Sequence, residues 1–392
     1  MKTYKANRVV LFAGGGTAGH VVPALAVAEV IRKAGAARAC FCGSTSGFEQ
    51  KLVTSAGFPF VSIPTAPYLR RFDRSLAKSA LLNSFGLAKA CMLIHRLRPA
   101  VVVGMGGYVS VPVGIAAVLN RCPLILHEQN SIPGLGNRLL SPLAELVCVS
   151  FPSTVQRFPQ AVWTGNPVRF GHEQATSTGK RKKSKTLLCF GGSQGAGYIN
   201  TLLLDSLTHL MTAGITLKWA AGRTDFSRVN KVLNGLFAAN PSWKKRIDLN
   251  EYITDMETAM MAADLVVARA GATTIAELTV LGKPALLIPF PHATDNHQVV
   301  NARQLERSGG CRVIEQRELG FPGASAVELF VTQLQDLLDN RDALDEMERC
   351  SGNFGKKGAA YSVFRIIMQH ISKISGSAPI SGAMEDPWGK TG

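Results

Sequence analysis

The apolar positions of the chain fall into short uninterrupted runs that alternate with longer stretches of helical periodicity. The clearest run, Val9 to Ala13, leads into a glycine-rich segment and then a helical pattern, and Leu187 to Phe190 repeats this arrangement in the second half. Similar runs recur at 39–42, 101–103, 123–126, 146–149, 216–220, 265–268 and 285–289. Alternating strands and helices predict parallel sheets with helices on both faces, and right-handed crossovers place the loops along one edge. We therefore expect an α/β chain of two doubly wound domains that face each other across a cleft.

A polar, basic segment at residues 171–185 shows no apolar periodicity and separates the two halves of the chain. This division predicts an N-terminal domain over residues 1–168, a linker over 169–186 and a C-terminal domain over 187–345. Helices over 346–375 are expected to pack back towards the N-terminal domain, and residues 376–392 are expected to be a disordered tail. The tail is rich in Gly, Ser and Pro.

Composition narrows the class of protein. The chain has 392 residues, of which 46% are hydrophobic and 18% charged, as is typical of a globular protein with two domains. Its eight cysteines form no CxxC pair and no Cys/His cluster, so they support neither a zinc site nor a disulfide framework. The N-terminus lacks the long apolar region of a signal peptide, and the reducing cytoplasm is the expected compartment. Residues 99–120 carry no charge, but their glycines and Pro112 favour a strand, a glycine turn and a short helix over a membrane span.

The net charge of +16 is concentrated in the first domain, where residues 1–165 hold 17 basic and 5 acidic residues. Basic and apolar side chains interleave between residues 68 and 98, which suits an anionic membrane surface. An amphipathic helix whose apolar side faces its own core explains the pattern equally well. Nucleic acid ranks below both, because no RRM, KH or zinc-finger signature accompanies the charge. The candidate membrane-associating residues are Arg70, Arg71, Phe72, Arg74, Lys78, Leu82, Phe85 and Lys89.

The first glycine loop, Gly14-x-Gly16-x-x-Gly19, has the spacing of a dinucleotide-binding fingerprint. That fingerprint expects an acidic residue at the end of the second strand, where this chain has none. The nearest acid, Glu49, lies well past the strand, so an NAD-binding role is weakened. His20 follows in the first turn of the helix, where a neutral imidazole suits a general base. The alternative is a histidine that only packs against the neighbouring domain.

Two further loops in the second half have the small residues and hydroxyls of an anion site at a helix N-terminus. One is Gly191 to Gly195, which lacks the lysine of a P-loop, and the other is Arg269 to Thr274. Glu277 lies one helical turn beyond Thr273, from where its carboxylate can accept hydrogen bonds from ribose hydroxyls. A solvated surface glutamate is the equally weighted alternative.

Taken together, the ordered motifs GGTAGH, GMGGYVS, HEQN, TGNPVR, GGSQGA, RAGATTIAE and DNHQVVNA resemble one family. It is the family of bacterial N-acetylglucosaminyltransferases that convert lipid I to lipid II in peptidoglycan synthesis, and the resemblance runs from about residue 8 to residue 370. It implies the GT-B glycosyltransferase fold, with two Rossmann-like domains. It also implies that UDP-GlcNAc binds to the C-terminal domain and that the lipid acceptor binds to the N-terminal, membrane-associating domain.

The resemblance assigns roles residue by residue. His20 and Glu128 are the candidate general bases. The donor-binding residues implied are Thr17, Ala18, Gly19, Asn130, Arg169, Ser193, Ile253, Ala272, Thr273, Thr274, Ile275, Ala276, Glu277 and Gln298. The backbone of Ile253 is expected to read uracil, and Asn130 to lie near the acceptor sugar as well. Ala18 replaces the usual glycine of the family, and Gly197 stands where an arginine is common.

The implied reaction is a single inverting displacement in which the 4-hydroxyl of the acceptor MurNAc attacks the anomeric carbon of GlcNAc. The sequence contains no Asp-x-Asp metal anchor, so no metal and no cofactor are expected, and two helix N-termini are expected to stabilise the departing UDP. The expected location is peripheral, on the cytoplasmic face of the bacterial inner membrane. Whether other cell-wall synthesis proteins bind is left open. Another lipid glycosyltransferase and a UDP-GlcNAc 2-epimerase of the same fold are the alternatives among enzymes, and a non-catalytic nucleotide-sugar-binding regulator is the alternative outside them.

Overall fold

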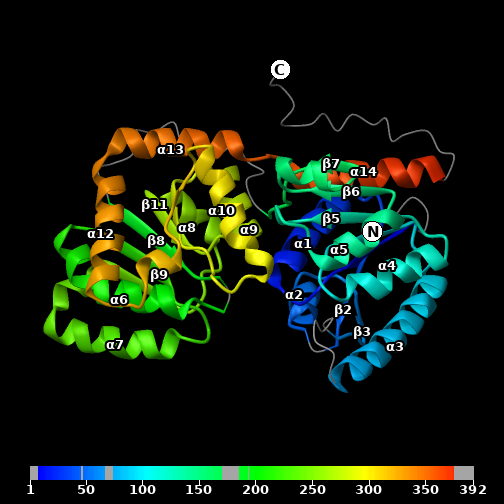
Figure 1. The fold of residues 1–392 in the computed structure, drawn as a ribbon, viewed down its shortest axis with the longest axis horizontal. Coiled ribbons are helices and arrows are strands. Elements are labelled where there is room, and N and C mark those ends of the chain that lie inside the picture. Colours follow the sequence, from blue (N-terminus) through cyan, green and yellow to red (C-terminus); the bar gives the residue numbers. More distant parts are fainter. Residues whose placement is uncertain (1–7, 46, 67–73, 170–184, 193, 375–392) are drawn as a thin grey trace. The chain divides into compact units, whose positions relative to one another are not determined.

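The computed structural model describes residues 8–45, 47–66, 74–169, 185–192 and 194–374. The chain divides into two compact units (Figure 1), Met1–Arg169 with Lys357–Gly392, and Phe170–Lys356. Each unit is built around its own parallel sheet and is described by itself.

The sheet of the first unit has, among the described residues, seven parallel strands in the order β3-β2-β1-β4-β5-β6-β7. The strands are β1 (Val9–Ala13), β2 (Arg38–Ser44), β3 (Phe60–Ile63), β4 (Val101–Gly104), β5 (Leu124–Glu128), β6 (Leu146–Val149) and β7 (Ala161–Trp163). Successive residues of β1 point to opposite faces, so that Val10 and Phe12 enter one core and Leu11 enters the other. Because both faces are covered, the central strands consist of buried residues throughout.

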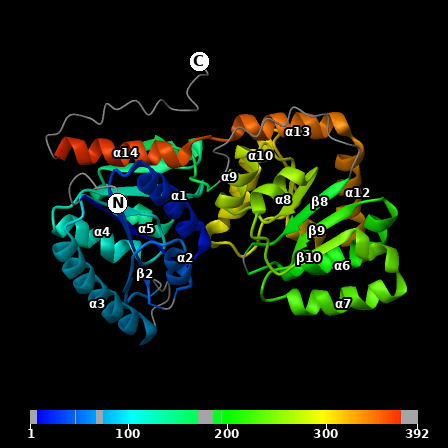
Figure 2. The ribbon, with the colours of Figure 1, turned by 180° about the vertical axis from the view of Figure 1, so that it is seen from behind.

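The helices of the first unit cover both faces of this sheet. They are α1 (Ala18–Ala34), α2 (Glu49–Ser55), α3 (Arg74–Leu97), α4 (Ser110–Leu119), α5 (Leu135–Leu140) and α14 (Ala359–Ile374), with 3-10 turns η1 (Ser141–Leu143) and η2 (Pro152–Arg157). Apolar side chains of α1 and α14 form one core with the Val10 face, whereas α3, α4 and α5 bury theirs on the other face. The packing of α14 along α1 brings the C-terminal end of the described chain into the first unit (Figure 2).

The second unit has, in the part that the structure describes, a six-stranded parallel sheet in the order β10-β9-β8-β11-β12-β13. The strands are β8 (Thr186–Phe190), β9 (Thr216–Ala220), β10 (Ile247–Asn250), β11 (Leu265–Ala268), β12 (Ala285–Leu287) and β13 (Arg312–Val313). The helices are α6 (Gly197–Thr212), α7 (Phe226–Ala239), α8 (Met256–Ala262), α9 (Ala272–Val280), α10 (His297–Arg307), α11 (Gln316–Leu319), α12 (Ala324–Asp339) and α13 (Arg341–Phe354), with 3-10 turns η3 (Pro241–Lys245) and η4 (Thr294–Asn296). Side chains of α6, α7 and α12 form the main core with one face of the sheet.

These two parallel sheets confirm the predicted α/β class. The uncharged segment 99–120 forms β4, a turn with left-handed Gly106 and Gly107, and α4, as the sequence indicated. In the described residues no helix combines the length and the apolar character needed to cross a membrane.

The chain returns to the first unit later than the sequence suggested. The sequence predicts helices over residues 346–375 that pack back towards the N-terminal domain; α14 does belong to the first unit, whereas α13 belongs to the second. Most of the expected linker and all of the expected tail lie outside the described residues.

Candidate functional site

The glycine loops after β1 and β4 lie against each other at the carboxyl edge of the first sheet. A Cβ atom added to Gly107 would lie 2.3 Å from the carbonyl oxygen of Gly15, and Gly107 has a left-handed φ of 78°. The hydroxyl of Ser110 donates to the carbonyl oxygens of Ala13 and Gly106, at 2.9 and 2.6 Å, and so ties the two loops together. Only glycine allows this approach, which explains the composition of the GMGGYVS motif.

His20 lies in the first turn of α1 with its ring against these glycines. Its Nδ1 atom is 2.8 Å from the carbonyl oxygen of Gly15 and 3.2 Å from the hydroxyl oxygen of Thr17. A carbonyl oxygen can only accept, so we assign the ring proton to Nδ1, which leaves the lone pair of the neutral ring on Nε2. The Nε2 edge faces Gly106, where a Cβ atom would approach it to 3.1 Å. The geometry therefore presents Nε2 as the basic nitrogen.

The HEQN motif ends β5 in a hydrogen-bonded network. The Nε2 atom of His127 donates to the carbonyl of Gly165, at 3.2 Å, and its Nδ1 atom accepts from the side-chain amide of Gln129, at 3.1 Å. Burial lowers the pKa of His127 to about 4, so this ring is neutral at pH 7. Gln129 also donates to the carbonyl of Met105, which links the end of β5 to the GMGGYVS loop.

Glu128 is buried, and both of its carboxylate oxygens are occupied. Oε1 accepts from the backbone N–H of Asn130 at 3.0 Å, and Oε2 accepts from the backbone N–H of Gly134 at 3.0 Å and the side-chain amide of Asn137 at 2.9 Å. Burial raises the pKa of the Glu128 carboxyl, and these donors partly offset the rise. The arrangement anchors residues 129–137 to the sheet, a role that the sequence did not indicate.

In the second unit, the loop after β8 approaches the loop after β9 as closely as backbone allows. Gly195 and Gly222 both have left-handed φ values, 88° and 82°, and a Cβ atom on Gly195 would lie 2.3 Å from the carbonyl oxygen of Ala221. This packing directs the N-terminus of α6 towards the carboxyl edge of the sheet. Ser193, the residue expected at the donor phosphates, lies outside the described residues.

The loop after β11, which the sequence predicts to be a second anion cradle, leads into α9. Gly271 precedes α9 in extended conformation, and the hydroxyl of Thr273 is buried without a hydrogen-bond partner. An orphaned hydroxyl at a helix N-terminus indicates a polar ligand at this place. Of the other residues expected here, Ala272 and Ile275 are buried, whereas Thr274 and Ala276 are partly exposed.

Glu277 lies one turn further along α9, partly exposed. Within the described residues no hydrogen bond or ion pair involves its carboxylate, and desolvation by burial raises its pKa to about 8. A carboxylate held without a partner is poised to accept hydrogen bonds from a ligand, as the ribose-binding expectation requires. Glu277 is only partly exposed, whereas the alternative from the sequence is a fully solvated surface glutamate.

Arg269 fixes the position of the cradle. Its guanidinium donates to the carbonyls of Ile288 and Pro289, both at 3.0 Å, and to the side-chain oxygen of Gln316, at 2.9 Å. Burial lowers the pKa of Arg269 to about 10, so the side chain stays charged at pH 7. Its contacts connect the loops after β11, β12 and β13.

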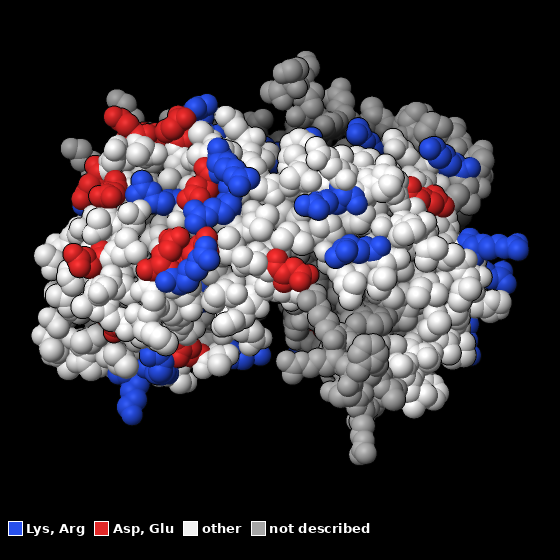
Figure 3. All heavy atoms as spheres, viewed as in Figure 1, with Lys and Arg blue, Asp and Glu red and all other residues white. Residues whose placement is uncertain are grey.

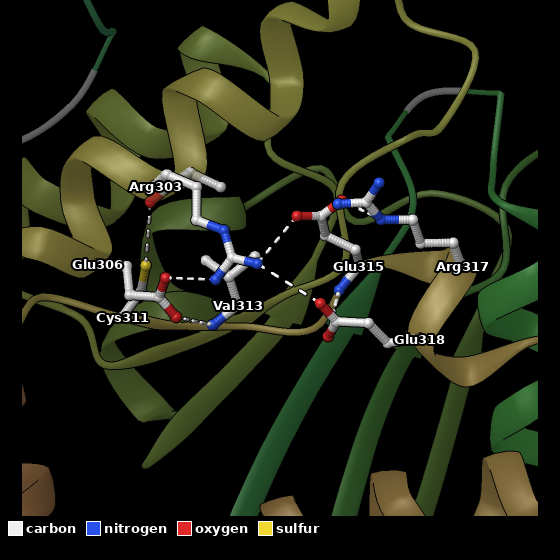
Figure 4. Close-up of polar contacts among 8 residues, drawn as sticks. Arg303, Glu306, Cys311, Val313, Glu315, Arg317 and Glu318 are labelled. Atoms are coloured by element: carbon white, nitrogen blue, oxygen red, sulfur yellow. Dashed lines mark hydrogen bonds and ion pairs between the residues drawn. The ribbon is translucent and has the colours of Figure 1, made fainter.

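Gln298 lies in the first turn of α10, and its Oε1 atom accepts from the backbone N–H of Phe290 at 3.0 Å. Its side-chain amide nitrogen takes no part in this hydrogen bond. Arg303, five residues further along α10, pairs with Glu306, Glu315 and Glu318 at 2.6, 2.9 and 3.5 Å (Figure 4). These side-chain hydrogen bonds raise the pKa of Arg303 further above its ordinary value. The cluster holds the helix that carries Gln298 against β13 and α11.

Two other expected donor residues, Ile253 and Arg169, belong to different units. Ile253 follows β10 with a buried side chain, and Arg169 is exposed at the end of a described segment of the first unit. The expected residues thus form two groups. Thr17 to His20 with Glu128 and Asn130 lie at the carboxyl edge of the first sheet, and Ile253, Thr273, Glu277 and Gln298 lie at that of the second.

The basic, apolar segment forms α3, where the described side chains lie on two faces. Ala90 and Ile94 are buried, whereas Leu81, Phe85 and Met92 are exposed by 60, 62 and 56%. Leu82 is also exposed and Lys89 is partly exposed. Arg70, Arg71 and Phe72 lie outside the described residues, as do the side chains of Arg74 and Lys78. The core-facing interpretation therefore accounts for only one side of the helix.

Leu119, Leu135, Leu139 and Leu143 extend this exposed apolar surface onto α4, α5 and η1, which pack in series beside α3. On the face shown in Figure 3, the side chains of the first unit, on the right, carry basic groups with few acidic ones, whereas the second unit mixes both signs. We call these exposed residues of α3, α4, α5 and η1 the apolar surface.

Comparison with known proteins places these features in a family. The model of the glycosyltransferase family 28 N-terminal domain matches residues 10–149, and that of the C-terminal domain matches residues 186–363. A relative from Halothermothrix orenii, a UDP-N-acetylglucosamine–N-acetylmuramyl-(pentapeptide) pyrophosphoryl-undecaprenol N-acetylglucosamine transferase, is 37% identical over 91% of this chain and 98% of its own. The transferase of the same name from Moorella thermoacetica is 36% identical over 92% of this chain and 99% of its own.

Comparison with solved structures leads to the same family. The crystal structure of MurG from Acinetobacter baumannii has a TM-score of 0.71 and 28% identity, and the match covers 92% of this chain and 99% of that one. A UDP-glucose:anthocyanidin 3-O-glucosyltransferase in complex with UDP has a TM-score of 0.66 at 14% identity, over 95% of this chain and 100% of that one, and shows the shared fold alone. These matches confirm the resemblance drawn from the motifs. The chain belongs to the family of UDP-N-acetylglucosamine–N-acetylmuramyl-(pentapeptide) pyrophosphoryl-undecaprenol N-acetylglucosamine transferases and is a glycosyltransferase.

Proposed function

We propose that this chain transfers GlcNAc from UDP-GlcNAc to the 4-hydroxyl of the MurNAc of lipid I and so forms lipid II. The observation that carries the proposal is His20, held with its proton on Nδ1 by the Gly15 carbonyl in the first unit. The second unit supplies what a nucleotide sugar needs, an orphaned hydroxyl at a helix N-terminus and a carboxylate without a partner.

The proposed step is one inverting displacement. Nε2 of His20 takes the proton of the acceptor 4-hydroxyl as that oxygen bonds to the anomeric carbon of GlcNAc, while the bond from that carbon to the UDP oxygen breaks. The electron pair leaves with UDP, whose developing charge is stabilised by the N-termini of α6 and α9. The chain lacks an Asp-x-Asp sequence, and we propose that the step is independent of a metal.

Geometry favours His20 over Glu128 as the base. N–H groups of Asn130, Gly134 and Asn137 donate to the Glu128 carboxylate, so a proton accepted there would compete with the hydrogen bonds that hold the loop 129–137. Replacing His20 by Ala is expected to lower kcat by about 10²–10⁴-fold with little change in UDP affinity. Near-normal kcat in that variant would return the role to Glu128.

The test of the reaction is transfer of labelled GlcNAc from UDP-GlcNAc to a soluble short-chain lipid I analogue in the presence of EDTA. A β-1,4-linked disaccharide product is the expected result, and it identifies both substrates, the stereochemistry and the metal independence. Formation of UDP-ManNAc without transfer to the acceptor would instead identify a 2-epimerase. Transfer to diacylglycerol or to another polyprenyl phosphate would identify a different lipid glycosyltransferase.

We further propose that the apolar surface docks on an anionic membrane, which places the chain on the cytoplasmic face of the inner membrane without spanning it. Leu81, Phe85 and Met92 recur at spacings of four and seven on one face of α3, and the first unit carries most of the excess positive charge. Flotation with vesicles that contain phosphatidylglycerol tests the proposal. Replacing Leu81 and Phe85 by Ser is expected to weaken binding strongly, while the matched Val232→Ser variant, on an exposed apolar residue of α7, leaves it unchanged. Binding that ignored the first pair would refute the proposal.

A further inference from the structure

Glu49, the first residue of α2, is fully buried with an exposed fraction of 0%. Its Oε1 atom accepts from the backbone N–H of Ser44 at 2.9 Å and from the hydroxyl of Ser44 at 2.7 Å. Its Oε2 atom is buried without a hydrogen-bond partner. Burial of a half-satisfied carboxyl is costly, and an apolar side chain of similar volume would fill the same space without that cost. The residue therefore requires an explanation other than core packing.

Three glycines make room for this one carboxyl group. A Cβ atom added to Gly15 would lie 2.4 Å from Oε1 of Glu49, and one added to Gly47 would lie 1.7 Å from Oε2. One added to Gly43 would lie 2.7 Å from Cγ. No other residue type fits at these positions unless the glutamate moves. The chain thus shapes the ends of β1 and β2 around the Glu49 side chain.

Gly15 connects Glu49 with His20. On one side, the Gly15 backbone lies against the Glu49 carboxyl, and on the other, Gly107 lies against the Gly15 carbonyl oxygen. That same oxygen accepts the Nδ1 proton of His20 at 2.8 Å. The peptide that selects the tautomer of His20 is therefore held between Glu49 and the GMGGYVS loop.

We propose that Glu49 is a positioning residue for His20. Its carboxyl group holds the Gly15 peptide in the orientation that keeps the proton of the neutral ring on Nδ1 and the lone pair on Nε2. This inference rests on the proposed function, because it concerns the base of the transfer reaction. Two titratable side chains of the described residues lie near this loop: His127, whose pKa is affected by His20, and Tyr108, which lies against Gly16.

The first experiment compares kcat and the affinity for UDP in four proteins: wild type, Glu49→Ala, Glu49→Gln and Val53→Ala. Val53 lies on the same helix, is buried, and belongs to the core formed by α1 and α14, so its truncation controls for loss of stability in α2. We expect Glu49→Ala to lower kcat by about ten- to a hundredfold through misplacement of His20, and Glu49→Gln, which keeps the shape and the Ser44 contacts, to recover most of it. Affinity for UDP stays unchanged in all four. Wild-type kcat in Glu49→Ala, or an equal loss of kcat in Val53→Ala, would overturn the proposal.

The second experiment needs no turnover. Ring ¹⁵N shifts of His20, assigned by comparison with His20→Gln, report the tautomer of the neutral imidazole. We expect the Nδ1–H form in wild type and in Glu49→Gln, and a mixture of tautomers in Glu49→Ala. An unchanged Nδ1–H form in Glu49→Ala would refute the inference. If Glu49→Ala does not fold, Ser44→Ala, which removes one bond to the same oxygen, replaces it and is expected to shift the tautomer in the same direction. Because this readout is independent of substrate, absence of transfer by the wild type would refute the proposed function and leave the inference on Glu49 to be judged by the spectra.

Discussion

The raised pKa of Glu277 predicts that donor affinity depends on pH. If the carboxylate accepts hydrogen bonds from the ribose hydroxyls, only its ionised form binds UDP-GlcNAc well. Burial without a partner raises the pKa of this group to about 8 in the unliganded protein. Donor binding must therefore displace a proton at neutral pH, and the affinity reports that cost.

The size of the effect follows from the fraction ionised. With a pKa of about 8, roughly a tenth of the molecules carry ionised Glu277 at pH 7 and roughly a hundredth at pH 6. The apparent Kd should then rise about tenfold at pH 7 and about a hundredfold at pH 6, relative to its limit at high pH. Stability changes in the opposite sense. The folded pKa lies above that of an unfolded glutamate, so the unliganded protein loses stability as the pH rises from about 4 to about 8.

Titration calorimetry with UDP-GlcNAc between pH 6 and 8.5, without acceptor, measures the dependence. The diphosphate of this donor is esterified at both ends, so it lacks the ionisation near pH 6 of a phosphate monoester. The matched control is Glu277→Gln, which is expected to bind more weakly at pH 8.5, to show a nearly flat profile, and to melt at a higher temperature than wild type at pH 8 but not at pH 4. A flat profile for the wild-type protein would refute the assignment of Glu277 to the donor.

Three further predictions concern the framework of the two sites. Gly107→Ala should abolish transfer, because a Cβ atom would lie 2.3 Å from the Gly15 carbonyl oxygen. The control is Gly35→Ala, at a left-handed glycine with open space around it, which should cost only about 1–2 kcal/mol of stability. Equal transfer activities of the two variants would contradict this prediction. Glu128→Gln places an N–H group among N–H donors and should lower the free energy of unfolding by about 1–3 kcal/mol, as measured by urea denaturation. An unchanged free energy of unfolding would show that the Glu128 carboxylate does not anchor the loop 129–137. Arg303→Met should loosen α10 and raise the KM for UDP-GlcNAc severalfold with kcat nearly unchanged, and a fall in kcat alone would argue against a role through Gln298.

The strands that the sequence predicted and those that it missed differ in their place in the sheets. The predicted strands lie inside the two sheets, where both faces are covered, so most of their residues are apolar and buried. The missed strands are β3, β7, β10 and β13, and each lies at the edge of a sheet. They are short and partly exposed, as Phe60–Ile63 and Ala161–Trp163 show, so they lack the longer buried runs that mark the interior strands.

The candidate site was predicted wherever a loop follows an interior strand. Glycines, hydroxyls and His20 could be placed from the sequence, because a parallel sheet aligns the carboxyl ends of its strands. Our proposal of His20 over Glu128 as the base rests in part on Asn137, which reaches the Glu128 carboxylate from α5, and no local pattern encodes that contact. Glu49 was set aside because it does not end a strand, yet α2 returns it to the glycine loop.

Three glutamates near these loops show how partners separate structural from ligand-binding roles. Glu49 and Glu128 are buried and accept hydrogen bonds from their own loops, so these bonds stabilise the loop backbone without any ligand. Desolvation raises the pKa of Glu277, which has no such bonds within the described residues, and a ligand that supplies hydroxyl donors offsets that desolvation on binding. Changes at Glu49 or Glu128 should therefore reduce transfer while UDP affinity persists, and a change at Glu277 should reduce UDP affinity first. If all three variants lost UDP affinity to the same extent, this division of roles would be wrong.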